Sequence, residues 1–360
     1  MVKSMTEIRV AIAGVGNCAS ALIQGVHFYR TTESEESVPG LMHVNFGGYY
    51  PRDLRFVGAF DVDKSKVGKD LSEAIFVPPN NTRKFAEVPF QGVEVRSGPV
   101  MDGIGKYVKP IINTTDSVPV NVSDELKAMN ADVLVSYLPV GSEDAVRWYA
   151  DQAIDAGCAF VNCMPVFIAS DEKWQRKFAA AGIPVAGDDV MSQIGATVLH
   201  KSLVKMLVDR GVKIDKSYQL NIGGDTDFLN MLEEGRLESK RVSKTSAVQA
   251  MVPYKVPLRI GPSDYVNFLQ NKKICYIWIN GRYFGDSPVN IDVKLDIWDA
   301  PNSGGVVIDA IRAIKLGIDR KISGPLTSIS AYAFKHPPEQ APYSVAKQWV
   351  EEFIQGKRER

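Results

Sequence analysis

The chain has 360 residues, of which 45% are hydrophobic and 23% are charged, and its 42 Lys and Arg residues balance its 42 Asp and Glu residues. These values are ordinary for a globular protein, and the length allows two domains. A chain without net charge has no global field to recruit nucleic acid or an anionic membrane, so any anion must be recognised by a local site. We expect neither nucleic acid nor a membrane as a partner.

The four cysteines, Cys18, Cys158, Cys163 and Cys275, form no CxxC pair. This spacing favours a reduced chain over a disulfide scaffold or a zinc module. The first residues enter an apolar strand without the apolar core of a signal peptide, and no uninterrupted apolar run is long enough to span a bilayer. We therefore expect a cytoplasmic protein.

A glycine-rich turn follows the first apolar strand, residues 8–13, and precedes a helical pattern. In Gly14-x-Gly16-x-x-Ala19, Gly14 permits a tight turn and Gly16 leaves room for a pyrophosphate, while Ala19 lets the helix pack on the strand. The helix amino terminus offers N–H groups to phosphates. The pattern predicts a dinucleotide site, although glycines alone also fit an ordinary strand–turn–helix.

The next predicted strand, residues 54–63, contains Asp61. We expect its carboxylate to accept hydrogen bonds from the adenosine ribose, which favours NAD over NADP. Asp61 lies 47 residues after Gly14, whereas about 20 is usual. The excess falls in the polar segment 30–53, which we interpret as a surface excursion or a subunit contact.

Strands and helices then alternate, which is typical of a doubly wound parallel sheet. The predicted strands are 131–139, 158–165 and 183–187, and the predicted helices are 142–156 and 171–181. Polar residues follow the strands, where such folds bind ligands. The adjacent Asp188 and Asp189 could indicate a metal site, but such acids often cap the next helix. The four histidines form no ligand spacing, and we assign them no role.

The second half of the chain changes pattern after a helix predicted for 196–210. Residues 218–224 read as a strand, and Asn280-Gly281 within 272–285 predicts a hairpin turn, because both positions tolerate positive φ. Residues 289–297 alternate apolar and polar side chains, which predicts a strand with one buried side and one solvated or subunit-facing side.

Two further helices, around 306–314 and 344–354, are expected to return to the first domain. We therefore predict an α/β fold, in which a Rossmann-type doubly wound parallel sheet carries an inserted α+β domain with a largely antiparallel sheet. The NAD-binding domain would comprise residues 1–200 and 301–360, and the inserted domain residues 201–300.

The stretch LESKRVSK, residues 237–244, concentrates cations. Lys240 and Lys244 lie four residues apart, so on a helix both ammonium groups project from one face and repel each other. A solvated helix face is the ordinary explanation. The preceding stretch LNIGGDTDFLNMLEEGR joins a glycine-ended strand to acids and asparagine, and this order favours a site for a phosphorylated, polyhydroxylated substrate.

With these motifs the chain resembles the myo-inositol-1-phosphate synthase family in its shorter prokaryotic form. The resemblance runs from Ile8 to Phe353 and is carried by GVGNCASALIQGV, DVLVSYLPVGSE, GDD..SQ.GAT, NIGG..DFLNML, LESK..SKT and NSGGVVIDAIRAIK. It implies an inositol-3-phosphate synthase, an isomerase that uses NAD catalytically on glucose 6-phosphate. Oxidation at C5, enolate formation, aldol closure onto C1 and re-reduction leave no net redox change.

The resemblance also implies a homotetramer, a possible monovalent or divalent cation, and a set of site residues. Proton transfer and chemistry at the C5 oxygen would fall to Lys244 and Lys335. Phosphate or enolate oxygen would be held by Lys240 and by Lys273, or by Lys272 if the alignment slips. Substrate-binding residues would be Asn221, Asp225 and Asp227, with Asp225 standing where the family usually has asparagine. Cofactor-binding residues would be Gly14, Gly16, Asn17, Cys18, Ala19, Asp61, Ser136, Pro139, Asp189, Ser192 and Asp299.

Two other functions compete with this interpretation. An NAD-dependent sugar-phosphate dehydrogenase of similar build would release NADH stoichiometrically, which the isomerase would not. A non-catalytic NAD-binding sensor would not need the lysines, yet all four lysine positions are filled here. The filled positions favour the isomerase.

Overall fold

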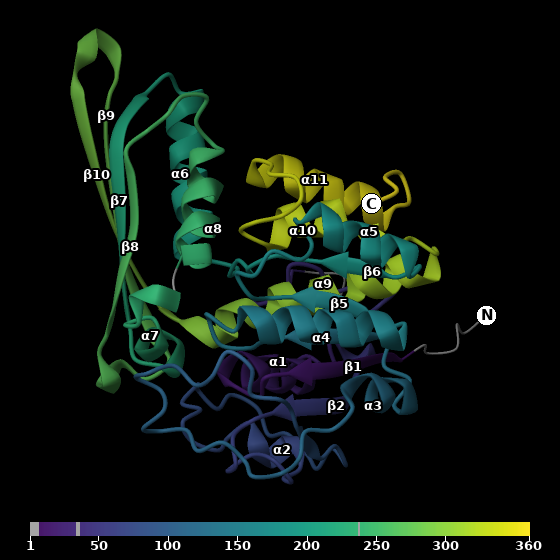
Figure 1. Ribbon diagram of the computed structural model, residues 1–360. Coiled ribbons are helices and arrows are strands. Elements are labelled where there is room, and N and C mark those ends of the chain that lie inside the picture. The colour runs from purple at the N-terminus through teal and green to yellow at the C-terminus, as the bar shows by residue number, and fades with distance from the viewer. Residues whose placement is uncertain (1–6, 34–36, 237) are drawn as a thin grey trace.

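The computed structural model describes residues 7–33, 37–236 and 238–360, without the side chains of 238–241 and 262, and contains two β-sheets (Figure 1). The first sheet has seven parallel strands in the order β11-β6-β5-β4-β1-β2-β3. From β3 to β6 this is the doubly wound order 3-2-1-4-5-6, as predicted. The strands are β1 (Ile8–Ala13), β2 (Leu54–Asp61), β3 (Val95–Ser97), β4 (Val133–Ser136), β5 (Ala159–Asn162), β6 (Pro184–Ala186) and β11 (Gly324–Pro325).

Helices cover both faces of this sheet, because its strands are apolar on both sides. In β1, Val10 and Ile12 belong to one apolar cluster while Ala11 and Ala13 belong to the other, as the two-residue period of a strand requires. The first cluster includes residues of α1 (Asn17–Phe28), α9 (Asp299–Asp319), α10 (Thr327–Ala333) and α11 (Tyr343–Ile354). The second includes residues of α3 (Val122–Ala128), α4 (Glu143–Ala156) and α5 (Glu172–Ala180). The final helices therefore return to the first sheet, as expected.

The second sheet has four strands in the order β10-β9-β7-β8, antiparallel except for the parallel pair β7 and β8. Its strands are β7 (Lys213–Gly223), β8 (Leu258–Tyr265), β9 (Lys272–Arg282) and β10 (Pro288–Trp298). The helices of this unit are α6 (Ala196–Asp209), α7 (Thr226–Asn230) and α8 (Glu238–Gln249), and α6 and α8 pack against one face of the sheet (Figure 1). The sequence did not predict β8, which runs through Gly261 and Pro262 with a register shift against β7 between Ile260 and Ser263.

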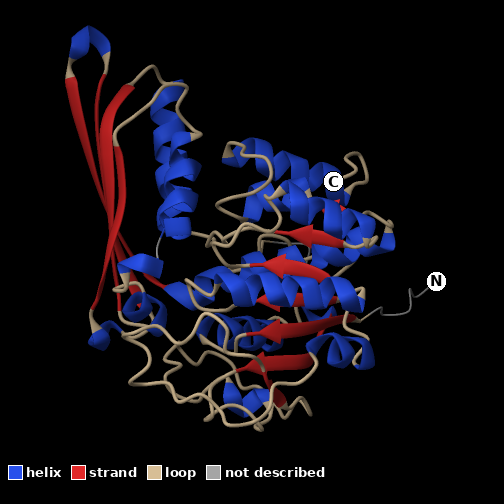
Figure 2. Ribbon diagram, in the orientation of Figure 1, coloured by secondary structure: helices blue, strands red, loops and turns tan. Residues whose placement is uncertain are grey.

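In Figure 2 the strands of the second sheet run across the direction of those of the first, and the parallel strands of the first point their carboxyl ends toward the second. That edge is where open α/β sheets bind ligands. The short helix α2 (Leu71–Ala74) and the 3-10 turns Pro51–Asp53, Glu234–Arg236, Asn267–Leu269 and Phe284–Asp286 complete the described elements. No helix in the described ranges is both long and apolar enough to cross a membrane.

The hairpin turn predicted at Asn280-Gly281 is wrong. Both residues lie inside β9, and the chain reverses further on, around Gly285, where φ is +67°. A Cβ on Gly281 would lie 2.6 Å from the carbonyl oxygen of Lys213. The glycine therefore serves close approach of β7 and β9, which the local sequence cannot distinguish from a turn.

The segment 30–53 is not simply a surface excursion. Residues 34–36 lie outside the described ranges, but Leu41, Val44 and Phe46 join the core of the first unit. The buried guanidinium of Arg312 on α9 donates hydrogen bonds to the carbonyl oxygens of Val44 (2.9 Å) and Tyr49 (3.0 Å). This part of the insertion is held against α9 by contacts that its polar composition did not indicate.

Candidate active site

A cavity of about 310 Å³ lies where the carboxyl ends of the parallel strands face the second unit. Both the glycine turn and the lysine-bearing segments line it, although they are far apart in the sequence. The side chain of Lys240, in helix α8, lies outside the described part of the chain. The predicted site residues that line the cavity are Gly14, Gly16, Asn17, Cys18, Asp61, Pro139, Asp189, Ser192, Asn221, Asp225, Asp227, Lys244, Lys273, Asp299 and Lys335.

The glycine turn has the shape that a pyrophosphate requires. Gly14 has φ of +94°, and a Cβ there would lie 2.6 Å from the carbonyl oxygen of Tyr137. Gly16 has open space where a Cβ would be, and no side chain caps the amino terminus of α1 that it begins. Open space beside uncapped N–H groups at a helix amino terminus fits an anionic dinucleotide.

Asp61 also shapes this turn. Its carboxylate accepts hydrogen bonds from the backbone N–H groups of Val15 (2.7 Å), Val62 (2.7 Å) and Asp63 (2.9 Å). At the next peptide group, the ammonium of Lys66 donates to the carbonyl oxygen of Val15 at 3.0 Å. The backbone at Val15 is therefore held from both sides, and Lys66 is a supporting residue that the sequence did not reveal.

Asn17 joins the glycine turn to neighbouring loops. Its side-chain oxygen accepts from the backbone N–H groups of Asn81 (2.8 Å) and Thr82 (2.9 Å), and its nitrogen donates to the side-chain oxygen of Asn81 (3.1 Å). The Asn81 side chain in turn donates to the carbonyl oxygen of Gly224, just after β7, at 3.2 Å. This chain of amides links the cofactor end of the cavity to the second unit.

Three further predicted residues near the turn are Ala19, Ser136 and Cys18. Ala19 and Ser136 are fully buried and do not line the cavity. Cys18 and Cys163 do line it, and burial raises the pKa of the Cys18 thiol to about 12 and that of the Cys163 thiol well above its usual value. Both thiols are therefore protonated near neutral pH and are unsuited to act as nucleophiles.

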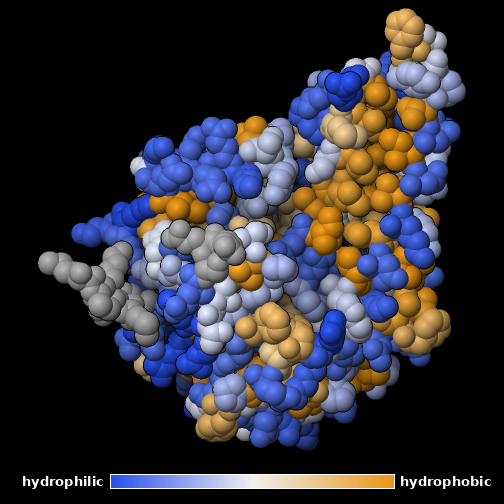
Figure 3. All heavy atoms as spheres, turned by 180° about the vertical axis from the view of Figure 1, so that it is seen from behind, coloured by the Kyte–Doolittle hydropathy of each residue, from blue (hydrophilic) through white to orange (hydrophobic). Residues whose placement is uncertain are grey.

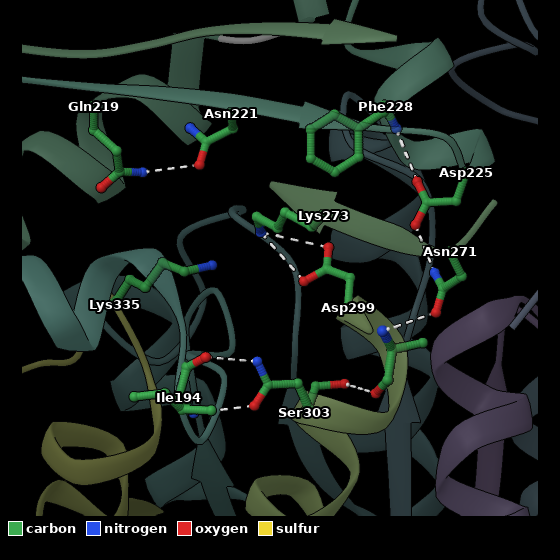
Figure 4. A network of polar contacts seen from close by, with 12 residues as sticks. Ile194, Gln219, Asn221, Asp225, Phe228, Asn271, Lys273, Asp299, Ser303 and Lys335 are labelled. Atoms are coloured by element: carbon green, nitrogen blue, oxygen red, sulfur yellow. Dashed lines mark hydrogen bonds and ion pairs between the residues drawn. The ribbon is translucent and has the colours of Figure 1, made fainter. Parts of the chain in front are cut away.

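Lys273, on β9, enters the cavity with a carboxylate partner. Its ammonium lies 3.2 and 3.4 Å from the two oxygens of Asp299 at the start of α9 (Figure 4). Burial lowers the pKa of Lys273, but the charge of Asp299, the hydrogen bonds to it and the charge of Asp227 together raise the pKa overall, so the lysine stays cationic. Lys272 lies over the ring of Trp298 instead and is not among the residues that line the cavity.

Lys335 approaches from the first unit and pairs with Asp189. Its ammonium donates to one carboxylate oxygen at 2.8 Å, and the hydroxyl of Ser243 on α8 donates to the other at 2.7 Å. Lys244, one residue further along α8, is buried and also lines the cavity. Figure 4 shows Lys273 and Lys335 coming from opposite sides and pointing toward the same space. Three described lysines thus converge on one cavity.

Asn221 offers an unused donor to this cavity. It is almost fully buried on the inner side of β7, and its side-chain oxygen accepts from Gln219 at 3.1 Å (Figure 4). Its side-chain nitrogen has no hydrogen-bond partner among the described residues. Gln219 was missed by the sequence analysis, although a position two residues before Asn221 on a strand shares its face.

Behind Gln219 lies a buried histidine. The Nδ1 atom of His200 is 3.4 Å from the side-chain oxygen of Gln219, and its Nε2 atom is 2.8 Å from the hydroxyl of Ser217. Burial lowers the pKa of His200 to about 4, so the imidazole is neutral near pH 7. This histidine contacts Gln219, which lines the cavity, but does not line the cavity itself.

The acidic side of the cavity is organised by Asp225 and Asn271. Asp225 caps α7 by accepting from the backbone N–H of Phe228 (3.1 Å), and it accepts from the Asn271 side chain at 2.7 Å (Figure 4). Burial, followed by the charges of Asp227 and Asp299, raises the pKa of Asp225 to about 7. Asn271 also binds the amino terminus of α9, a role that only the assembled structure reveals.

The adjacent aspartates have separate roles. Asp188 is fully buried and accepts from the side chain of Asn162 (2.7 Å) and from the backbone N–H groups of Ile168, Ala169 and Ser170 (each 3.0 Å). Asp188 therefore holds the loop after β5. It does not cap α6, whose N-cap residue is Gly195. Among the described residues, no three His, Cys, Asp or Glu side chains are grouped so as to hold a metal ion.

The fold and the cavity define a Rossmann-type protein in which a dinucleotide-shaped turn faces a cluster of lysines. A model of the myo-inositol-1-phosphate synthase family matches residues 195–300. The chain is 55% identical to inositol-3-phosphate synthase of Mycobacterium tuberculosis (strain CDC 1551 / Oshkosh) over 357 residues, which cover 98% of this chain and 97% of that protein. It is 53% identical to inositol-3-phosphate synthase of Corynebacterium glutamicum, with 98% and 99% covered.

A solved structure supports the same assignment. The crystal structure of a myo-inositol-1-phosphate synthase-related protein from Thermotoga maritima superposes with a TM-score of 0.79 at 26% identity, covering 97% of this chain and 98% of that one. The chain belongs to the myo-inositol-1-phosphate synthase family, and the resemblance inferred from its motifs is confirmed.

Proposed function

We propose that the protein is an inositol-3-phosphate synthase, which isomerises D-glucose 6-phosphate to 1D-myo-inositol 3-phosphate with NAD and no net redox change. The observation that carries this proposal is the convergence of Lys244, Lys273 and Lys335 on the cavity that also contains the open glycine turn. Such a cluster of ammonium groups would form charge-assisted hydrogen bonds with the phosphate and oxygens of a phosphorylated sugar.

The cofactor end of the cavity suits NAD. The open space beside Gly16 and the uncapped start of α1 would hold the pyrophosphate, and Asp61 would face the adenosine ribose. When bound, NAD takes up and later returns a hydride at C5 of the sugar. The further residues proposed to contact it are Gly14, Asn17, Cys18, Ala19, Ser136, Pro139, Asp189, Ser192 and Asp299.

The lysines would act on the sugar oxygens. Lys335, oriented by Asp189, would hold the C5 oxygen and move its proton, and Lys244 would share in proton transfer. Lys273 would stabilise phosphate or enolate oxygen, where fixed positive charge in a buried site lowers the energy of developing negative charge. The free amide nitrogen of Asn221 would donate to a substrate oxygen.

Three further residues complete the proposed substrate site. Asp225 and Asp227 line the cavity at the end of β7, and Lys240 would hold phosphate together with Lys273. The domain proposed to carry catalysis and tetramerisation is 201–300, between the two parts of the NAD-binding domain, 1–200 and 301–360.

The decisive experiment follows glucose 6-phosphate by phosphorus NMR with substoichiometric NAD, while absorbance reports NADH. Many turnovers to inositol phosphate without net NADH accumulation are expected. NADH rising in step with substrate loss would instead identify a dehydrogenase, and no reaction under varied cations would favour a non-catalytic sensor. Repeating the assay with monovalent and divalent cations, and after chelation, tests the proposed cation requirement.

We also propose a cytoplasmic homotetramer assembled through the second sheet. The edge strand β10 leaves Ile291, Val293 and Leu295 only partly covered, and Figure 3 shows a hydrophobic surface over this part of the molecule. Apolar side chains at an uncovered sheet edge favour association with another chain. Analytical ultracentrifugation is expected to give a tetramer, and a monomer at all concentrations would contradict the proposal.

A further inference from the structure

Helix α8 meets the first unit through two serines on one face. The hydroxyl of Ser243, which is fully buried, donates to Asp189 at 2.7 Å. The hydroxyl of Ser246 donates to the backbone carbonyl of Ser243 at 3.0 Å and lies 3.4 Å from Nδ1 of His336. Residues three apart on a helix are neighbours, so both serines face the same surface. Ser243 lies in the stretch 237–244 that carries Lys240 and Lys244, but its side chain is uncharged, so a role in binding anions through charge does not explain it.

The surface that these serines meet is a short backbone ladder. His336 and Asp188 exchange backbone hydrogen bonds of 3.0 and 3.1 Å, and the N–H of Lys335 donates to the carbonyl oxygen of Asp189 at 2.8 Å. The backbones of Asp189 and Lys335 are therefore fixed relative to each other. What remains free to rotate is the Asp189 carboxylate, because the terminal torsion of an aspartate is broad.

The Asp189 carboxylate accepts hydrogen bonds from both units. One oxygen accepts from Lys335 of the first unit, and the other accepts from Ser243 of the second. We propose that Ser243 is a positioning residue whose hydroxyl fixes the rotation of this carboxylate and thereby aims the Lys335 ammonium at the reacting sugar oxygen. The same bond brings α8, with Lys244, to that point.

A purely structural role would not require a serine here. Alanine has the higher helix propensity, and a buried hydroxyl is costly unless it is hydrogen-bonded. The Ser243 hydroxyl instead donates its proton to the charged carboxylate of Asp189. Hydrogen bonds to charged groups are shorter and stronger than those between neutral groups. Its position one residue before Lys244 means that the motif supplies both a cation and the anchor for the opposing acid–lysine pair.

The proposal rests on the proposed synthase activity, and it is tested with S243A and the matched control S246A in the full chain. S246A removes a hydroxyl from the same helix face without touching Asp189. For S243A we expect kcat to fall about tenfold or more, with KM for glucose 6-phosphate and NAD affinity within about twofold of wild type. The transient rise of NADH absorbance in a single turnover should slow by the same factor. S246A should change kcat by less than about twofold.

Either of two results would overturn the positioning role: equal kcat values in S243A and S246A, or a rise in KM with unchanged kcat. If S243A does not fold, S243C keeps a side chain of similar size with a weaker donor. The cysteine variant should then lose part of kcat, and wild-type kcat would reject the proposal. Failure of the synthase assignment is separate, because wild-type protein would then form no inositol phosphate.

Discussion

The two ends of the cavity differ in which part of the chain forms them: one is formed mainly by backbone and the other mainly by charged side chains. At the cofactor end, the backbone of the Gly14–Gly16 turn and the start of α1 supply the shape, and neighbouring side chains mainly hold that backbone in place. At the proposed substrate end, charged side chains come from several separate segments, among them α8, β9, the start of α9, the segment after β6 and the segment after α10. The first end is formed by residues that are neighbours in the sequence, whereas the second is formed by residues that are far apart in the sequence.

This difference predicts which kind of substitution should damage each end of the cavity. A backbone-built site is damaged by added volume, because a Cβ takes up the space or forces the peptide to move. A side-chain-built site is damaged by lost charge, since the fold survives while charge stabilisation in the transition state is lost. The following predictions separate the two kinds of damage, beginning with the largest expected effect.

Replacing Lys244 by alanine should remove charge without disturbing the cofactor end. We expect turnover of glucose 6-phosphate to fall by about 10²–10⁴-fold, the usual contribution of a positioned proton-transfer group. NAD affinity, measured by fluorescence titration, should be unchanged. Lys205→Ala on α6, which removes a partly exposed lysine paired with Asp209, is the control and should retain activity. Turnover of K244A within tenfold of wild type would remove Lys244 from the mechanism.

Replacing Gly14 by alanine should damage the cofactor end through volume. Gly211 has a similar φ of +78° but open space around its Cβ position, so G211A measures backbone strain alone. We expect G211A to lower the free energy of unfolding by about 1–2 kcal/mol. G14A should lower it by about 2–4 kcal/mol and also abolish NAD binding. Equal urea midpoints for the two variants would show that the contact with Tyr137 does not matter.

Acid should weaken the fold through the histidine behind the substrate end. Burial lowers the pKa of His200 to about 4 in the folded state, whereas an unfolded histidine has a pKa of about 6.5. The unfolded chain therefore binds the proton more readily, and stability is lost as pH falls from about 6.5 to about 4. The slope from this residue is about 1.4 kcal/mol per pH unit, with no contribution above pH 6.5.

Urea unfolding of wild type and H200Q between pH 4 and 8 measures this slope. The difference between their stabilities should shrink on acidification, because glutamine does not titrate. A difference that is independent of pH would show that the pKa of His200 is the same in the folded and unfolded states. In that case the polar support behind Gln219 and Asn221 would be looser than the structure indicates.

Replacing Asp225 by asparagine should have the smallest effect and should depend on pH. Burial and the charges of Asp227 and Asp299 raise the pKa of Asp225 to about 7, so it gains negative charge between pH 6 and 8. Because this charge lies in the cavity proposed to bind a phosphate, KM for glucose 6-phosphate should rise a few-fold across that range in wild type. D225N should flatten this rise, and an identical pH dependence in both proteins would contradict the prediction.

The sequence predicted the first unit well because its signals are local. Alternating apolar strands and amphipathic helices place the parallel sheet, and the glycine spacing places the turn at Gly14 and Gly16. The long β10 also follows from short-range periodicity. The hairpin predicted at Asn280-Gly281 failed, since a glycine needed for a turn and a glycine needed for close strand approach look alike in one sequence.

What the sequence by itself determined, then, is the set of elements, the dinucleotide-shaped turn and the family, because these depend on neighbours a few residues apart. Which lysines meet, and what orients them, was decided only by the tertiary structure. Asp189 and Lys335 are 146 residues apart, and Ser243 reaches the same carboxylate across 54 residues. Such contacts depend on strand order and on how α8 docks, so the roles of Ser243, Gln219 and Asn271 become visible only when the two units face each other.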